Sequence, residues 1–165
     1  MAYVLGFIAT DGNLFKKGGS ERLAIAVQKE DCWLLKKIIS ILKVDNPVIR
    51  ITQNKYCSIT ITQSGLVETF SKWNITERKS LTLQFPDKMP KKLVSHFIRG
   101  VFDGDGTITF KYNRKSQTFM QSVRIVSASQ DFVNSLSNIL TKARIPNSIR
   151  SENRESSGRS TLYSV

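Results

Sequence analysis

A short segment near the N-terminus of the chain recurs in its second half. Leu5–Gly12 (LGFIATDG) resembles Arg99–Gly106 (RGVFDGDG), and both glycines and the aspartate align at one constant offset. An apolar helical face follows each copy, because Leu34, Leu35, Ile38, Ile41 and Leu42 correspond to Phe132, Val133, Leu136, Ile139 and Leu140. Further along, Ile49–Arg50 and Ser58–Ile59 recur as Ile149–Arg150 and Ser164–Val165. The chain is therefore built from two copies of one structural unit.

Each copy shows the same order of hydrophobic patterns. An apolar helix ends at Gly12 or Gly106, and two strands follow in which apolar and polar residues alternate. An amphipathic helix comes next, at about 30–43 and about 129–143, and two further strands follow it. A helix near 64–73 closes the first copy, and the second shows no counterpart of it.

These patterns predict an α+β protein with two pseudo-symmetric αββαββ(α) repeats, each with an antiparallel four-stranded sheet. The expected units are residues 1–74 and 91–165, and a linker at 75–90 contains Pro86 and Pro90 as helix stops.

The charge of the chain indicates a polyanionic partner. Of its 165 residues, 25 are Lys or Arg and 13 are Asp or Glu, which gives a net charge of +12. Neither a membrane span nor an export signal is found, so we expect an intracellular protein with no membrane partner. Cys32 and Cys57 lie in apolar segments without CxxC spacing, and we expect them to be buried free thiols.

The recurring glycines and aspartates indicate a shared site. Glycine inside a helix costs about 1 kcal/mol relative to alanine, so Gly6 and Gly100 suggest that two helices approach closely. The ends of these helices would bring Asp11 and Asp105 together, and Gly12 and Gly106 are expected in left-handed geometry. A carboxylate at a helix C-terminus is unfavourable, and a divalent cation would relieve that strain.

Other catalytic constellations are not supported. The single histidine, His96, is expected on a helix surface, and the sequence holds no phosphate-binding loop of the GxxxxGK[ST] type. A calcium loop that includes Asp103 and Asp105 would require an acid two residues before Asp103 and a Glu at its twelfth position, where Val101 and Tyr112 stand. Asp103 itself has no counterpart in the first copy, and we expect it to cap the helix or support a site residue.

The segments Leu5–Gly12 and Phe97–Gly106 resemble the motifs of the LAGLIDADG homing endonucleases in their single-chain, two-motif form. The second motif is close to the family pattern, while the first has Ala9 where many members have an acid. The resemblance implies a sequence-specific DNA endonuclease whose two motif helices pack together and whose sheets bind DNA.

The resemblance also implies the site residues and the cofactor. Asp11 and Asp105 would be catalytic and would bind Mg²⁺ together with Gly12 and Gly106, and Gln28 would order water at the scissile phosphate. Mn²⁺ would substitute for Mg²⁺, and Ca²⁺ would support binding without efficient cleavage. No small-molecule cofactor is expected.

The polar faces of the strands and the hairpin tips supply the expected DNA contacts. These residues are Lys16, Lys17, Arg22, Gln28, Arg50, Thr52, Thr60, Lys111, Arg114, Lys115, Arg124, Arg150 and Arg154. A strand of about eight residues spans about eight base pairs. The chain would therefore act as a monomer on a long, asymmetric double-stranded site of about sixteen pairs or more.

Two alternatives remain open on the sequence. One is an intron maturase that binds structured RNA, and the other is a DNA-binding regulator that does not cleave. The presence of both aspartates argues against the second alternative.

Overall fold

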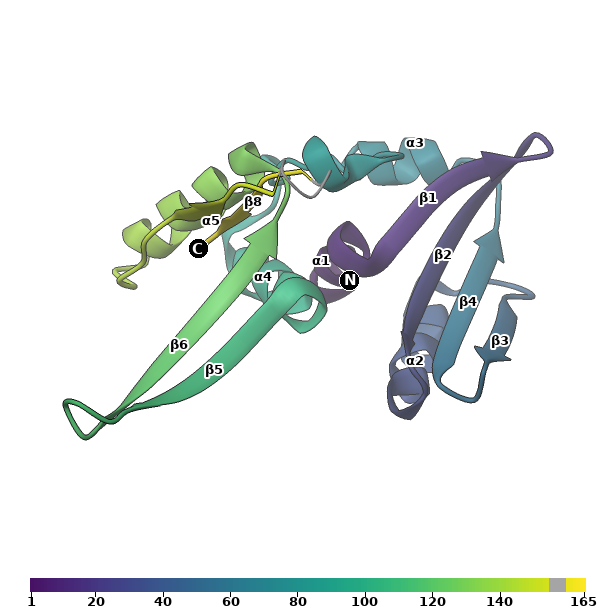
Figure 1. The fold of residues 1–165 in the computed structure, drawn as a ribbon. Helices are drawn as coiled ribbons and strands as arrows, with labels where there is room; N and C mark the ends of the chain where they lie inside the picture. Colours follow the sequence, from purple (N-terminus) through teal and green to yellow (C-terminus); the bar gives the residue numbers. More distant parts are fainter. Residues whose placement is uncertain (155–159) are drawn as a thin grey trace.

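The computed structural model describes residues 1–154 and 160–165, which form two arms on either side of a central pair of helices (Figure 1). The first arm consists of α1 (Ala2–Asp11), β1 (Gly12–Lys17), β2 (Ser20–Gln28), η1 (Lys29–Asp31), α2 (Cys32–Leu42), β3 (Val48–Thr52), β4 (Tyr56–Thr62) and α3 (Leu66–Ser71). A 3-10 turn, η2 (Lys79–Leu81), lies between the arms. The second arm consists of α4 (Lys91–Asp105), β5 (Gly106–Asn113), β6 (Thr118–Ser127), α5 (Gln130–Lys142), β7 (Arg150–Glu152) and β8 (Leu162–Ser164).

Each arm holds one antiparallel four-stranded sheet, with strand orders β1-β2-β4-β3 and β5-β6-β8-β7. The registers match the sequence repeat, since Ile25 lies opposite Ile59 in the first sheet and Ile125 opposite Val165 in the second. Likewise Arg50 pairs with Ser58, and Arg150 pairs with Ser164. The predicted α+β class with two pseudo-symmetric sheets is confirmed.

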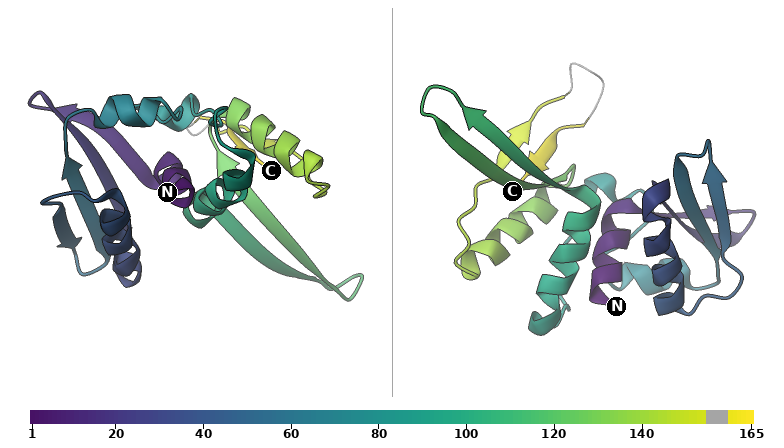
Figure 2. Two further views of the ribbon diagram at one scale, coloured as in Figure 1. Left: turned by 180° about the vertical axis from the view of Figure 1, so that it is seen from behind. Right: turned by 90° about the horizontal axis from the view of Figure 1, so that it is seen from below.

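The helices α1 and α4 lie side by side at the centre of the molecule (Figure 2). A Cβ atom added at Gly6 would lie 2.0 Å from the carbonyl oxygen of Phe97, and one added at Gly100 would lie 2.0 Å from that of Tyr3. Only a residue without a side chain permits this backbone contact. Both glycines are therefore required by the close approach of the helices, and the tight helix pair inferred from the sequence is present.

Apolar helix faces cover the inner side of the first sheet, and in the second sheet α5 packs against β6 and β8. In the first arm Leu35 and Ile38 of α2 and Phe70 of α3 are buried against the strands. In the second arm α5 begins at the cap residue Ser129, whose hydroxyl accepts a hydrogen bond from the N–H of Phe132. The same hydroxyl donates to the carbonyl of Leu83 at 2.6 Å, which ties the segment between the arms to α5.

Two expectations from the sequence were wrong. Cys32 and Cys57 form a disulfide, because the start of α2 packs against β4 and brings their Cα atoms to 5.4 Å. Gly12 and Gly106 have extended backbone geometry, with φ of −76° and −84°. Glycine is needed there for space, because a Cβ atom would lie 2.5 Å from the carbonyl oxygen of Ile8 or 2.2 Å from that of Phe102.

In the part of the chain that the structure describes, no helix combines the length and the apolar character needed to span a bilayer.

Candidate active site and sheet surfaces

The two aspartates of the repeated motif lie together at the ends of the paired helices. Asp11 and Asp105 are the last residues of α1 and α4, which run in the same direction. The helix ends are in contact, because a Cβ atom added at Gly104 would lie 3.1 Å from Oδ2 of Asp11. The packing of the helices therefore brings one carboxylate from each repeat to a single place between the two sheets.

The electrostatics of this pair favour a bound cation. Partial burial and the negative charge of Asp11 raise the pKa of Asp105 to about 6. The positive charge of Lys79 acts in the opposite direction and lowers that pKa. Burial likewise raises the pKa of Asp11. Two carboxylates that repel each other beside the negative ends of two helix dipoles are stabilised by positive charge.

A lysine from the segment between the arms supplies part of that charge. Lys79 begins η2, its side chain is buried, and its Nζ donates hydrogen bonds to the carbonyls of Gly12 and, at 3.4 Å, Thr10. Both aspartates act on its pKa, which burial lowers. Sequence reasoning missed Lys79, because a single lysine in a linker between two repeats carries no periodic or motif signal.

The oxygen atoms at this site fit a hard divalent cation. Carboxylate and backbone carbonyl oxygens are the ligands that Mg²⁺ accepts, usually one or two carboxylates completed by water and phosphate. The described residues contain no group of three or more His, Cys, Asp or Glu placed to hold a metal. The carbonyls of Thr10 and Gly12 already face one cation, the ammonium of Lys79. Asp11 and Asp105 are thus the residues that could hold Mg²⁺, and the carbonyl of Gly12 is shared with Lys79.

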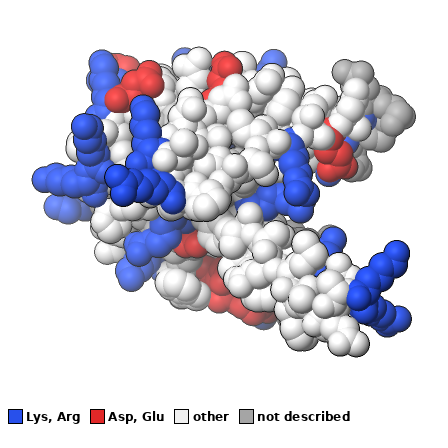
Figure 3. All heavy atoms as spheres, turned by 90° about the vertical axis from the view of Figure 1, so that its left-hand side faces the viewer, with Lys and Arg blue, Asp and Glu red and all other residues white. Residues whose placement is uncertain are grey.

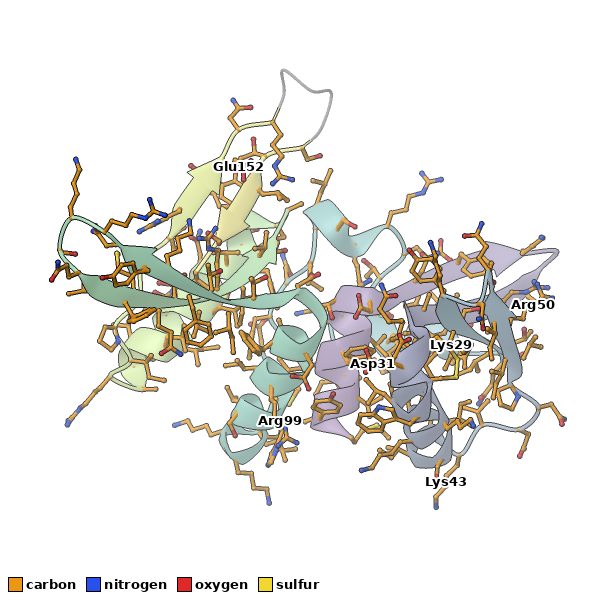
Figure 4. The ribbon with its side chains drawn as sticks, turned by 60° about the horizontal axis from the view of Figure 1, so that its bottom comes forward. Lys29, Asp31, Lys43, Arg50, Arg99 and Glu152 are labelled. Atoms are coloured by element: carbon orange, nitrogen blue, oxygen red, sulfur yellow. A yellow bond between two sulfur atoms is a disulfide. The ribbon has the colours of Figure 1, made fainter. Side chains whose placement is uncertain are left out.

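A cavity of about 490 Å³ adjoins Asp11 and receives groups from both repeats. Gln28, the last residue of β2, lines this cavity together with Gly104 and Asp103 of α4. Asp31, the last residue of η1, also lines the cavity and lies between α1 and α2 (Figure 4). Gln28 and Asp11 thus line one cavity, and a ligand held there would lie between them.

Asp103 takes part in a contact between the two motif helices. The hydroxyl of Tyr3 donates to Oδ2 of Asp103 at 2.8 Å, and the guanidinium of Arg99 lies 5.2 Å from the centre of the Tyr3 ring. This contact pins the side chain of Asp103 to α1, so its observed role is to support the helix pair.

The register of the first sheet gathers five of the expected DNA-binding residues on its outer face. Pairing of β2 with β4 and of β4 with β3 puts Arg22, Gln28, Arg50, Thr52 and Thr60 on that face, with the side chain of Lys17 at its tip. The buried Nε of Arg22 has no hydrogen-bond partner among the described residues. Lys16 points to the opposite face and lies 3.7 Å from Glu21.

The second sheet presents a similar outer face. Lys111, Arg124 and Arg150 share it, and Arg114 and Lys115 lie in the turn between β5 and β6. Arg154 holds the carboxylate of Glu152 with two hydrogen bonds, at 2.9 and 3.0 Å. Figure 4 shows Glu152 and Arg50 on the two separate sheets. Lys and Arg side chains outnumber acids across the face in Figure 3.

Comparisons with known proteins agree with this architecture. Residues 92–165 match the family model described as a LAGLIDADG-like domain. A relative in Methanocaldococcus jannaschii, described as a probable translation initiation factor IF-2, is 34% identical over 77 residues, which are 45% of this chain. The chain spans only 6% of that protein, so its activity does not carry over to this chain.

Solved structures resemble the chain over 99% of its length. They include a mesophilic variant of the homing endonuclease I-DmoI (TM-score 0.66, 20% identity, 85% of that chain) and I-DmoI in complex with DNA and Ca (0.64, 19%, 79%). A third is the meganuclease I-SmaMI bound to uncleaveable DNA (0.63, 15%, 76%). The chain thus has the LAGLIDADG endonuclease fold. More narrowly, it has the form in which one chain carries both motifs, and the resemblance stated from the sequence is confirmed.

Proposed function

We propose that this chain is a sequence-specific homing endonuclease that makes metal-dependent double-strand breaks in DNA. The observation that carries the proposal is the convergence of Asp11 and Asp105 between two sheets whose outer faces bear arginines and lysines. DNA bound by both sheets would then pass the two aspartates, which could act on the phosphate that lies between the sheets. Under this proposal residues 1–74 and 91–165 act as two half-site units joined by the linker 75–90.

The residues of the chain divide the work at the cleaved phosphate. Asp11 and Asp105 would hold Mg²⁺, which when bound neutralises phosphate charge and activates water. The ammonium of Lys79 would keep both carboxylates ionised and fix the backbone carbonyls at the end of α1. Gln28 would orient water in the cavity beside Asp11. Structures of I-DmoI with DNA hold Ca or Mn, and a variant was solved with its target DNA in Mg, which supports the choice of metals.

The two sheets would read different sequences. Arg22, Arg50 and Thr60 lie on one outer face, whereas Lys111, Arg124 and Arg150 lie on the other, so the two half-sites need not match. A monomer with internal pseudo-dimer symmetry would then bind one long asymmetric duplex of about sixteen pairs or more, at about 3.4 Å per pair along each strand.

Selection from a library of randomised duplexes tests the proposal. The chain is incubated with the library in Mg²⁺, and in EDTA as the control, and double-strand ends are recovered and sequenced. We expect cleavage at one long asymmetric site only in Mg²⁺. Retention of duplexes without any cut would instead support a regulator, and binding confined to structured RNA would support a maturase. Either result would refute the proposed activity.

A further inference from the structure

The two repeats differ in the connection that leads from a sheet strand into the following helix. In the first repeat β2 ends at Gln28, and the 3-10 turn η1 (Lys29–Asp31) leads into α2 (Figure 4). In the second repeat β6 leads into α5 through Ala128 and Ser129 alone. The first repeat therefore has the longer connection at this place in the fold.

Gln28 and Ala128 occupy matched positions in the two repeats. Ile25 of β2 and Ile125 of β6 each lie opposite the glycine that follows the motif helix, as the two ladders show. Gln28 and Ala128 each stand at the third residue after the matched isoleucine. The position that holds a carboxamide in the first repeat thus holds only a methyl group in the second.

The carboxamide of Gln28 belongs to the cavity beside Asp11. Both residues line this cavity of about 490 Å³, and the side chain of Gln28 makes no capping hydrogen bond to η1. A carboxamide can donate and accept hydrogen bonds, whereas an ionised carboxylate only accepts them. A water molecule held between these two side chains would have a fixed orientation, which favours its attack on a phosphate in the cavity.

The corresponding connection of the second repeat uses its polar groups for structure. The hydroxyl of Ser127 accepts a hydrogen bond of 3.1 Å from the N–H of Ser129. The buried hydroxyl of Ser129 accepts from the N–H of Phe132 and donates to the carbonyl of Leu83. Both hydroxyls therefore fix the start of α5, and Ala128 between them has no polar side-chain atom to offer a water molecule.

The buried ammonium of Lys79 adds to this inequality. Its Nζ donates hydrogen bonds to the carbonyls of Thr10 and Gly12, which flank Asp11 at the end of α1. These bonds hold the backbone on both sides of Asp11 in place. Asp11 thus has a braced backbone and a carboxamide across its cavity, and these two features come from the first repeat and the linker.

From the unequal surroundings of the two aspartates, and resting on the proposed function, we infer that the chain cuts the two DNA strands in a fixed order. The phosphodiester bond beside Asp11 is hydrolysed first, and the bond beside Asp105 is hydrolysed more slowly. In each step the oxygen of one water bonds to phosphorus and one P–O ester bond breaks. One proton of that water passes through solvent to the leaving oxygen, and the other stays with the new phosphate monoester. The intermediate is a duplex nicked always in the same strand.

The rates of the two strands test this order. The probe is the duplex selected from the library, with a different fluorophore at the 5′ end of each strand, and excess protein cuts it in Mg²⁺ in a single turnover. We expect one strand to be cut about tenfold or more faster than the other, as for a water-orienting group present on one side only. A supercoiled plasmid with the same site should pass through the nicked circle.

Two substitutions should act on opposite strands. Gln28→Ala should slow the faster strand by about tenfold or more and leave the slower strand unchanged. Ala128→Gln should speed the slower strand, because it places a carboxamide at the matched position. The matched control is Gln121→Ala, which removes an exposed carboxamide opposite Phe110 in the β5–β6 ladder, away from both aspartates, and should leave both rates unchanged. Duplex binding in EDTA should be the same for all three variants and the parent.

Equal rates for the two strands in the parent would overturn the inference and leave the proposed endonuclease intact. A Gln28→Ala variant that slows both strands alike would also overturn it, because the side chain would then serve the fold and not one strand. The same holds for an Ala128→Gln variant that binds the duplex but cuts the slower strand at the parent rate. Cleavage of neither strand would instead contradict the proposed function itself, so the two failures are distinguishable.

Discussion

The contact between α1 and α4 makes the substitution Gly6→Ala a quantitative test of the central helix pair. The added Cβ atom would lie 2.0 Å from the carbonyl oxygen of Phe97 and 3.0 Å from the N–H nitrogen of Val101, both backbone atoms that no rotamer change can move. The helices would have to separate by about 1.4 Å to restore ordinary contact. Alanine gains about 1 kcal/mol of helix propensity over glycine, whereas overpacking costs about 1–3 kcal/mol and is largest against backbone. We expect a net destabilisation of about 1–2 kcal/mol.

Urea and thermal unfolding followed by circular dichroism measure this effect. For a chain of this size the expected loss corresponds to a fall in Tm of about 2–8 °C. Gly19→Asn is the control, since a Cβ atom there meets nothing within 4 Å and asparagine tolerates the φ of +77°. If Gly6→Ala unfolds at the temperature of the parent, the backbone contact between the helices is not what places the two aspartates.

Three further predictions concern charge. Lys17→Ala should reduce the dependence of log affinity for DNA on log salt by about 0.9, while Lys16→Ala, on the opposite face beside Glu21, should change it less. Lys79→Met should slow cleavage about tenfold or more without loss of DNA binding, and it should move the acidic limb of the pH–rate profile upward, because Lys79 lowers the pKa of Asp105. The pKa of Asp105 in the fold, about 6, exceeds its value of 3.8 in an unfolded chain, so its ionised form destabilises the metal-free protein and protonation relieves this. Stability of the metal-free protein relative to Asp105→Asn should therefore rise as the pH falls from about 7 to about 5, as chemical denaturation can show, and cleavage should fall over the same range.

Most of the architecture could be predicted from the sequence because each strand and each α-helix except α3 occurs twice, once in each repeat. The alternation of Leu23, Ile25 and Val27 fixed the inner face of β2, and the same pattern at Val123 and Ile125 identified β6. Helix boundaries differed from the predictions by a few residues, since a 3-10 turn, Lys29–Asp31, precedes α2.

What the sequence did not predict depends on contacts between distant segments. The disulfide joins residues 25 positions apart, and only the packing of α2 on β4 brings them together. Lys79 binds the carbonyls at the end of α1 because η2 packs beside that end, which no local pattern encodes. Lys16 was expected to contact DNA because it lies in a basic hairpin tip. The register of β1 with β2 instead places its side chain on the inner face of the sheet, opposite Glu21.

Cleavage of the selected target by aspartate variants tests the central claim most directly. Asparagine keeps the size of aspartate and removes the charge that holds a hard cation, so Asp11→Asn and Asp105→Asn should each abolish double-strand cleavage in Mg²⁺. Both variants should still bind the target, because the outer faces of the sheets would hold the DNA. Asp103→Asn, at the Tyr3 contact, is the control and should retain most of the activity. If the Asp11→Asn, Asp105→Asn double variant cuts both strands at the rate of the parent, the two aspartates are not the active site and the account is wrong.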